Sequence, residues 1–401
     1  MRKLNRLPAV TLLLAAAATS PPAGAAKPKP PWEDPVIQAI DEKMAEYVAN
    51  GRASGVVTLV AKDGKVVHLG AVGKADLASG RAMRTDAIFR IASMTKPITA
   101  TAVLLCQDDG KLSVSDPVSK YVPEFKNAAL KGARPARPVT IRDLMTHTSG
   151  VANPRGLKGA AGEPTLAEIA VGVAGSPLQF PPGSQWRYGS GLTVCGRIIE
   201  VASGKPYDAF VRDRIFRPLG MADSAFVLTA AQAARLALMY EPAGEKDNKA
   251  LSASGRFAGS DPTESRTPGP SGGLFSTARD MGRFYQMILN GGRLDGVRIV
   301  SAKAVRQMTT LQTGDLETGF TPGNGWGLGW CIVRTPQGVT GMLSPGTFGH
   351  GGAFGTQGWV DPARKMIFVL MIQRVRFGNS DGSAIRGAFQ QAAVDALCGK
   401  P

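Results

Sequence analysis

Residues that build metal and redox sites are scarce in this sequence, which has three histidines and four cysteines among 401 residues. The histidines are dispersed and lack the paired spacing of a zinc hydrolase. The cysteines are too widely separated for a Cys-x-x-Cys redox or zinc motif, and the sequence assigns no disulfide among them. We therefore expect no bound metal and no organic cofactor.

Long hydrophobic runs are also missing. After residue 26 no segment reaches the ~18 uninterrupted apolar residues of a membrane-spanning helix, so we expect no stable membrane insertion. Three basic residues precede an apolar run at residues 7–18, and Ala-Gly-Ala follows at residues 23–25. This pattern predicts a signal peptide over residues 1–26, a linker over residues 27–33 and export to the periplasm or the medium.

Acidic residues are outnumbered by basic ones, and the formal net charge is +16. Removal of the predicted signal peptide takes away three positive charges and no negative ones, which leaves +13. The basic residues are scattered, and no block of them alternates with aromatic residues, as nucleic-acid binding would require. We expect a small-molecule substrate and no nucleic-acid partner, and the oligomeric state stays open.

The segment at residues 89–97, Phe-Arg-Ile-Ala-Ser-Met-Thr-Lys-Pro, organises the chain. Ser93 and Lys96 lie three residues apart at a predicted helix start, because Pro97 is tolerated only in a first helical turn. A serine hydroxyl needs an adjacent base, and a lysine serves if burial lowers its pKa. Ser93 is the only serine followed by lysine at the third position. The alternative is a helix-capping serine beside an exposed lysine.

Strand patterns occur near both ends of the chain and are sparse between residues 110 and 260. The predicted elements are a helix from residue 35 to Gly51, a hairpin of residues 56–61 and 66–69 turning at Asp63-Gly64, strands at 354–360 and 366–372, and a helix at 384–397. This predicts an α+β fold whose antiparallel sheet is built from both chain ends and flanked by the terminal helices. The sheet domain comprises residues 34–109 and 271–401, and a mainly helical region is inserted at 110–270.

Two other segments offer catalytic groups. Tyr188 lies on a loop just before a helix at residues 192–202, and a nearby lysine ammonium would lower the pKa of its phenol and suit it to relay protons. Residues 349–353, Gly-His-Gly-Gly-Ala, stand at the expected start of the first late strand, where the N–H of Ala353 and that of Ser93 would form an oxyanion hole. The alternatives are a packing aromatic residue and an ordinary glycine bend.

Together, Ser93-Met-Thr-Lys96, Tyr188-Gly-Ser190 and His350-Gly-Gly resemble the three active-site motifs of the penicillin-recognising serine hydrolases. Within them the chain is most similar to the class C β-lactamase-related branch, and specifically to the family VIII carboxylesterases. Further segments that look like the family are residues 144–150, 218–221, 272–278 and 325–330. The resemblance implies a β-lactamase/transpeptidase-like fold and Ser93, Lys96 and Tyr188 as the catalytic residues.

Two departures from the resemblance bear on the substrate. Ser190 stands where β-lactamases and peptidoglycan carboxypeptidases usually have asparagine, and His350 stands where they usually have lysine. A mostly neutral histidine holds a substrate carboxylate less well than lysine does. We expect neutral acyl esters as substrates, with His350, Gly351, Gly352, Trp186 and Ser190 as the substrate-binding residues.

Ser271 lies in a Gly-x-Ser-x-Gly sequence, the pattern of α/β-hydrolase nucleophiles. That nucleophile follows a buried strand, whereas Ser271 follows a polar, proline-containing stretch, so we do not expect it to be the nucleophile. His147, in Thr-His-Thr-Ser-Gly, is expected to be a hydrogen-bonded structural histidine, and His68 suggests no role.

The predicted function is an exported serine hydrolase that cleaves carboxylic esters through an acyl-enzyme on Ser93, with Lys96 and Tyr188 as base and proton shuttle. One alternative is a β-lactamase or D-alanyl-D-alanine carboxypeptidase that uses the same site on β-lactam or peptide-like substrates. Another is a non-catalytic envelope protein that binds through an inherited cleft.

Overall fold

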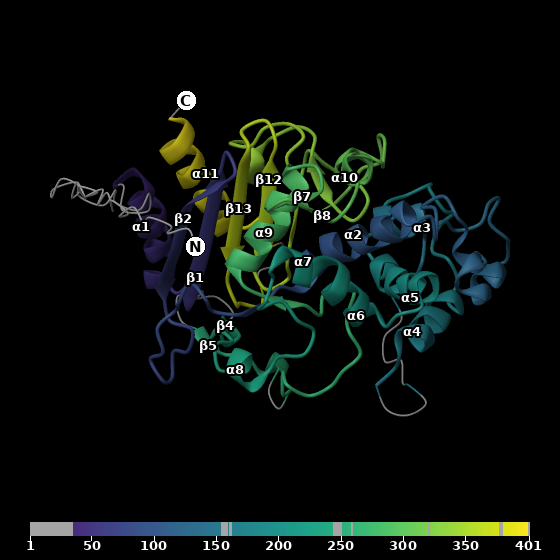
Figure 1. Ribbon diagram of the computed structural model, residues 1–401, viewed down its shortest axis with the longest axis horizontal. Coiled ribbons are helices and arrows are strands. Elements are labelled where there is room, and N and C mark those ends of the chain that lie inside the picture. Colours follow the sequence, from purple (N-terminus) through teal and green to yellow (C-terminus); the bar gives the residue numbers. More distant parts are fainter. Residues whose placement is uncertain are drawn as a thin grey trace, which may run out of the picture. The chain divides into compact units, whose positions relative to one another are not determined.

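Figure 1 shows the computed structural model of the chain, which describes residues 35–153, 159, 163–243, 251–257, 260–319, 321–376 and 380–399. The predicted signal peptide at 1–26 and linker at 27–33 lie outside the described residues. The chain divides into residues 1–30 and residues 31–401, and all described residues belong to the second unit.

A seven-stranded antiparallel sheet forms the centre of this unit, with strand order β2-β1-β13-β12-β11-β10-β9. Its strands are β1 (Gly55–Lys62), β2 (Lys65–Gly73), β9 (Asn324–Trp326), β10 (Cys331–Val333), β11 (Phe348–Gly351), β12 (Gln357–Asp361) and β13 (Met366–Met371). The first and last strands of the chain are neighbours, with Thr58 opposite Leu370. The predicted α+β fold, with a sheet built from both chain ends, is therefore confirmed.

The hairpin of β1 and β2 forms where the sequence predicts it. Asp63 and Gly64 have φ values of 49° and 81°, the left-handed conformations that a tight hairpin turn needs and that Asp-Gly readily adopts. β1 is buried along nearly its whole length, which explains its almost continuous apolar sequence.

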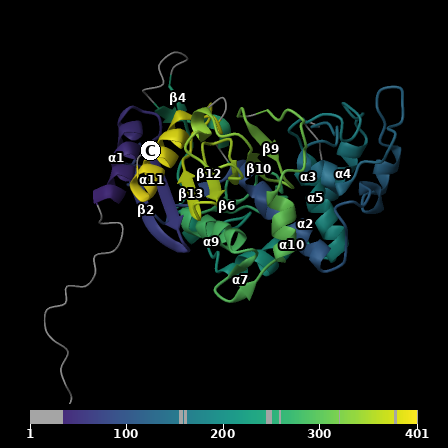
Figure 2. The ribbon, with the colours of Figure 1, turned by 90° about the horizontal axis from the view of Figure 1, so that it is seen from above.

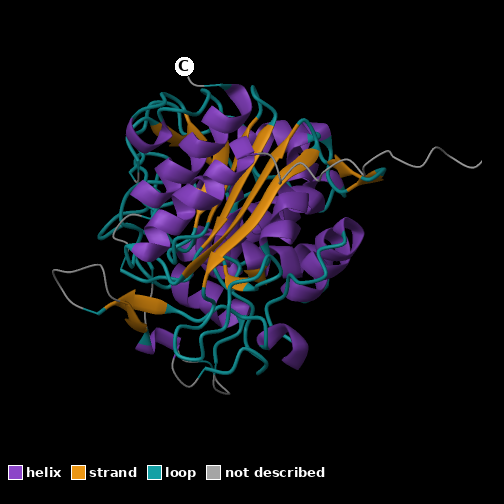
Figure 3. Cartoon of the chain, turned by 90° about the vertical axis from the view of Figure 1, so that its left-hand side faces the viewer, coloured by secondary structure: helices purple, strands orange, loops and turns teal. Residues whose placement is uncertain are grey.

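Helices cover both faces of the sheet (Figures 1 and 3). The helices α1 (Pro35–Ala49) and α11 (Ala384–Cys398) pack together on one face, and α9 (Ala278–Leu289) covers the other. Successive side chains of β13 point to opposite faces of the sheet. Phe368 and Leu370 join the core under α1 and α11, whereas Val369 joins the core under α9. This alternation follows from the period of two in a strand.

A mainly helical region lies beside the sheet and packs around α2 (Thr95–Asp108), whose residues 95–106 are all buried (Figure 2). Its other helices are α3 (Ile141–Thr146), α4 (Leu166–Ala174), α5 (Gly191–Ser203), α6 (Tyr207–Val211) and α7 (Arg217–Leu219). The limits predicted for this region, residues 110 and 270, stay a prediction. None of the described helices is long and apolar enough to cross a membrane.

Short elements complete the described chain. They are β3 (Phe89–Arg90), α8 (Ala230–Ala233), β4 (Tyr240–Pro242), β5 (Leu251–Ala253), β6 (Phe275–Ser276), β7 (Arg293–Leu294), β8 (Val297–Arg298) and α10 (Ala302–Thr309). The pairing of β3 with β6 places Phe89 opposite Ser276 and leads the chain toward Ser93.

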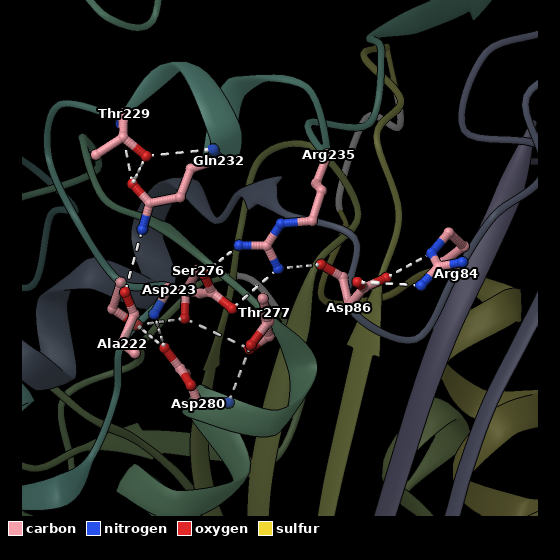
Figure 4. A network of polar contacts seen from close by, with 11 residues as sticks. Arg84, Asp86, Ala222, Asp223, Thr229, Gln232, Arg235, Ser276, Thr277 and Asp280 are labelled. Atoms are coloured by element: carbon pink, nitrogen blue, oxygen red, sulfur yellow. Dashed lines mark hydrogen bonds and ion pairs between the residues drawn. The ribbon is translucent and has the colours of Figure 1, made fainter.

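A polar network anchors β6 and the start of α9 (Figure 4). The buried Asp280 carboxylate accepts hydrogen bonds from the Asp223 N–H and the Ser224 hydroxyl, both at 2.9 Å. Ser224 and Ser276 share a hydrogen bond of 2.8 Å, and Arg235 pairs with Asp223. The network thereby fixes the strand against which β3 is paired.

One predicted strand was placed wrongly. The expected strand at 354–360 begins at Gln357, and residues 349–351 belong to the end of a separate strand, β11, rather than to a strand start. The chain reverses between the two strands, because the Gly352 N–H donates to the Thr356 carbonyl and the Gly355 N–H donates to the Gly352 carbonyl. Glycines allow this reversal, and the sequence alone reads them as part of a strand edge.

Candidate active site

Ser93 lies at the sharp turn from β3 into α2. Ala92, just before it, has a φ of 47°, a left-handed conformation that costs a non-glycine residue roughly 1 kcal/mol. A short 3₁₀ turn, Ala92–Met94, then leads into α2, as the proline at position 97 predicts. The strained turn brings Ser93 to the start of a helix, where its N–H has no partner within the helix.

Lys96 is the base candidate that the structure places beside Ser93. Its Nζ lies 3.0 Å from the Ser93 Oγ and donates to the Ser271 carbonyl at 2.7 Å. The side chain is buried, and burial lowers its pKa to about 7 although Asp381 acts in the opposite direction. Much of Lys96 is therefore a neutral amine near neutral pH, which can accept a proton from the serine.

Tyr188 completes the group of three. Its hydroxyl is hydrogen-bonded to Ser93, and the Lys96 Nζ lies 4.7 Å from the centre of its ring. The expected fall in its pKa is wrong: burial raises the pKa of Tyr188 far above its usual value, and the bond to Ser93 opposes this only in part. Burial is the largest influence on this phenol, and Asp381 and Cys331 act in the same direction. Tyr188 is thus a neutral phenol that can pass a proton on without forming a stable phenolate.

His350 faces the same hydroxyl. Burial lowers its pKa to about 3, so the imidazole is neutral, as the sequence analysis expects. Its Nδ1 lies 2.6 Å from the Gly351 carbonyl, which only accepts, so Nδ1 carries the proton. Its Nε2 is then an acceptor and lies 3.4 Å from the Tyr188 hydroxyl. No positive charge stands at the position that the resemblance gives to lysine.

His147 contacts the Tyr188 loop through its backbone carbonyl, its Nδ1 and its ring. Its carbonyl accepts from the Arg187 N–H at 2.9 Å, its Nδ1 accepts from the Gly189 N–H at 3.3 Å, and its ring lies 4.4 Å from the Tyr188 ring. Burial lowers its pKa well below the usual value. The sequence predicts a structural histidine here and carries no signal that it positions Tyr188.

The third motif approaches the nucleophile turn very closely. A Cβ on Gly352 would lie 2.4 Å from the Ile91 carbonyl oxygen, and one on Gly351 would clash with the Asp381 carboxylate. Ala353 follows, and within the described part of the chain its N–H donates no backbone hydrogen bond. The two expected oxyanion donors, Ser93 and Ala353, thus belong to segments in contact, and their joint action stays a prediction.

The other predicted substrate residues lie nearby but face other groups. Trp186 is half-buried and stacks on the buried Trp326 at 5.6 Å, at the edge of the cluster that includes Tyr188. The Ser190 hydroxyl lies 2.5 Å from the Asn153 Oδ1. Asn153, for which the sequence gives no expectation, thus contacts the residue that stands where the resemblance expects asparagine.

Ser271 lies in a turn, with no strand before it. Its carbonyl accepts from Lys96, and its hydroxyl shares a 2.8 Å hydrogen bond with Thr193. The structure therefore gives its backbone a role in holding the lysine. The four cysteines are free thiols, and three of them are buried.

This fold and this juxtaposition of serine, lysine and tyrosine define a serine hydrolase of the penicillin-recognising superfamily. The chain belongs to the family described as Beta-lactamase, whose sequence profile matches residues 40–393.

Named relatives differ in what they act on. Esterase EstB from Burkholderia gladioli is 32% identical over 373 residues, which cover 85% of this chain and 91% of that protein. Penicillin-binding protein 4 from Amycolatopsis lactamdurans is 34% identical over 312 residues, covering 76% and 75%. Among solved structures, EstCE1, a hydrolase with promiscuous acyltransferase activity, superposes with a TM-score of 0.74 at 22% identity, covering 89% of this chain and 98% of that one. This last likeness shows the fold alone.

Proposed function

We propose that this protein is an exported carboxylesterase that works through an acyl-enzyme on Ser93. The observation that carries the proposal is the contact of 3.0 Å between the amine of the buried Lys96 and the Ser93 hydroxyl. Similarity to esterase EstB supports an ester substrate. The neutral imidazole of His350 supports it too, because a site without a cation at this position anchors the carboxylate of a β-lactam or a peptide poorly.

The proposed mechanism begins when the neutral Lys96 amine, assisted by Tyr188, takes the Ser93 proton as the hydroxyl attacks the ester carbonyl. The N–H groups of Ser93 and Ala353 stabilise the oxyanion, and loss of one such donor typically costs about 3 to 4 kcal/mol of transition-state stabilisation. Tyr188 gives its proton to the leaving alcohol while it takes one from the Lys96 ammonium. Water activated by the same pair then releases the acid.

Similarity to a penicillin-binding protein favours a second candidate, hydrolysis of β-lactams or D-alanyl peptides at the same site. The two functions are separated by measuring p-nitrophenyl butyrate and a chromogenic cephalosporin side by side. We expect ester turnover to dominate. If cephalosporin turnover dominates instead, the assignment of the site stands, but the function is β-lactam hydrolysis.

The site is tested with three variants. We expect Ser93→Ala and Lys96→Ala to lower ester turnover by at least ~10³-fold. Ser271→Ala is the matched control, because it removes a hydroxyl beside the same lysine and keeps the carbonyl that Lys96 contacts. Activity that survives Ser93→Ala and disappears in Ser271→Ala would overturn the mechanism.

Export is proposed from the sequence of residues 1–26, which the structure does not describe. Expression in a bacterial host with N-terminal sequencing of the product tests it. We expect the mature chain to begin near residue 27 in the periplasm or medium.

A further inference from the structure

Two arginines, Arg90 and Arg256, gather beside the candidate site around one phenylalanine. The Arg90 guanidinium lies 4.3 Å from the centre of the Phe257 ring and 4.8 Å from that of Phe275. The Arg256 guanidinium lies 5.9 Å from Phe257 and 5.2 Å from Phe354. The side chains of Arg90, Arg256, Phe257 and Phe354 are called the arginine patch below.

The described part of the chain offers no acidic partner to the guanidinium groups of this patch. Those of Arg90 and Arg256 contact aromatic rings. The neighbouring Arg266 instead donates to the backbone carbonyls of Asp261 and Glu264, and its charge helps to lower the pKa of the Asp261 carboxyl. By contrast, many other arginines have such a partner, for example Arg137 with Asp143.

Arg90 is the less satisfied of the two, because its half-buried side chain has lost water without gaining a counterion among the described residues. Burial lowers its pKa to about 10, and the nearby positive charge of Arg266 adds to the effect. Two cations that repel each other at a partly dry site attract an anion strongly. A guanidinium held flat on an aromatic ring keeps its edge free for a carboxylate.

The patch adjoins both expected oxyanion donors. Phe354 follows Ala353 and packs with Ala92, the residue before Ser93, in one apolar cluster that Phe257 also contacts. The Phe257 and Phe354 rings meet at 5.5 Å. An apolar wall therefore runs from the nucleophile turn to the arginines.

The patch shares no ring contact with Tyr188 among the described residues. The Tyr188 ring contacts His147, Trp186, Trp326 and His350, and none of these belongs to the patch. Tyr188 is the proposed acid for the leaving alcohol, so the alcohol part of the ester belongs on its side. The acyl chain then extends along the apolar wall toward the arginines.

We propose that the arginine patch binds a carboxylate at the far end of the acyl chain, so that the preferred substrates are half-esters of dicarboxylic acids. This inference rests on the proposed esterase function and names its substrate class. The methylene groups of such a chain would lie on the Phe354 and Phe257 rings, and the terminal carboxylate would meet the guanidinium groups.

The test compares mono-p-nitrophenyl adipate and suberate with p-nitrophenyl hexanoate and octanoate, which have the same chain lengths without the terminal carboxylate. We expect kcat/KM to be at least ~10-fold higher for the charged ester at one of the lengths, mainly through a lower KM, with a preference that falls as salt rises. Equal kcat/KM for charged and neutral esters at both lengths would overturn the inference and leave the esterase function standing. Hydrolysis of none of the four esters would overturn the function as well.

The variant Arg256→Gln assigns the preference to the patch, because this side chain is exposed and its replacement does not threaten the fold. We expect the ratio of the two kcat/KM values to fall about tenfold, with part of it kept in Arg256→Lys, and to fall further when Arg90→Gln is added. Arg306→Gln is the matched control, since it removes one exposed positive charge on α10 and should keep the ratio. A preference that survives loss of both patch arginines would contradict the assignment.

Discussion

Lys96 is the residue whose protonation governs the proposed reaction. Its pKa of about 7 predicts that kcat/KM for a neutral ester rises with pH, about tenfold per unit below pH 7, and levels above it. Neither His147 nor His350 can supply this midpoint, because both have lowered pKa values. Measurement with p-nitrophenyl butyrate between about pH 6 and about pH 9 checks it. A midpoint close to 10.5, the ordinary value for lysine, would contradict the prediction.

His147 offers a second test at this scale, since it acts on the reaction only through Tyr188. We expect His147→Ala to lower kcat for p-nitrophenyl butyrate about tenfold with little change in KM, because the loop loses the acceptor for the Gly189 N–H and the ring loses its neighbour.

Two further variants separate positioning from general damage in this experiment. His147→Asn retains an acceptor close to the position of Nδ1, so it should recover part of the lost kcat. His68→Gln replaces another buried histidine, in β2, and should leave kcat unchanged. Equal losses in the alanine and asparagine variants would argue against a role in holding the Gly189 N–H.

At the scale of elements, the critical contact is the one between the turn after β11 and the turn before α2. The Thr356 hydroxyl donates to the Ile91 carbonyl at 3.0 Å, and Gly352 lies against both. We expect Gly352→Ala to lower kcat about 10²-fold, because the added Cβ pushes apart the segments that carry the two oxyanion donors. Steady-state kinetics on p-nitrophenyl butyrate measures the effect.

Gly387→Ala is the control for this substitution. The added Cβ would meet Val339 at 3.7 Å, an ordinary contact, in the first turn of α11. We expect unchanged kcat and a gain in stability of about 0.5 to 1 kcal/mol from the better helix former. Loss of activity in both glycine variants would indicate that neither reports on the oxyanion hole.

The elements also show which parts of the fold can be predicted from the sequence. The hairpin at Asp63-Gly64 and the start of α2 are local, and both are predicted correctly. β9 and β10 are absent from the predictions because they are three residues long and lie in a glycine-rich stretch. They become strands only because β10 pairs with β11 and β9 pairs with β10.

In the site, too, contacts between residues close in sequence can be predicted, and contacts between distant segments cannot. Ser93 and Lys96 share one helix start, so their spacing alone predicts the contact that the structure shows. Tyr188 and His350 reach them from distant segments, and only the family resemblance brings them together in advance. The sequence around His147 and Asn153 gives no indication of the contacts that these residues make. The direction of the Tyr188 pKa shift is set by burial, which cannot be inferred from a loop sequence.

At the scale of the whole molecule, burial of all three histidines makes the fold sensitive to acid. Burial lowers the pKa of His68 to about 4, that of His350 to about 3 and that of His147 well below 6.5. As the pH falls below 6.5, the unfolded chain comes to bind up to three more protons than the folded one, so the free energy of unfolding falls by up to about 4 kcal/mol per pH unit. Asp280 opposes this, because its pKa is raised to about 6 and the folded state takes up its proton first.

His68 provides the test of this account because it lies outside the site and bonds to Thr58 at 2.8 Å within the sheet. The neutral variant His68→Gln removes one of the three histidines that bind a proton in the unfolded chain but not in the folded one. We expect the wild type to lose about 2 kcal/mol more than His68→Gln between pH 6.5 and about pH 5, measured by urea unfolding at each pH. Parallel losses in the two proteins would mean that His68 does not contribute, and that the acid sensitivity arises at the two histidines beside Tyr188 or at the carboxylates.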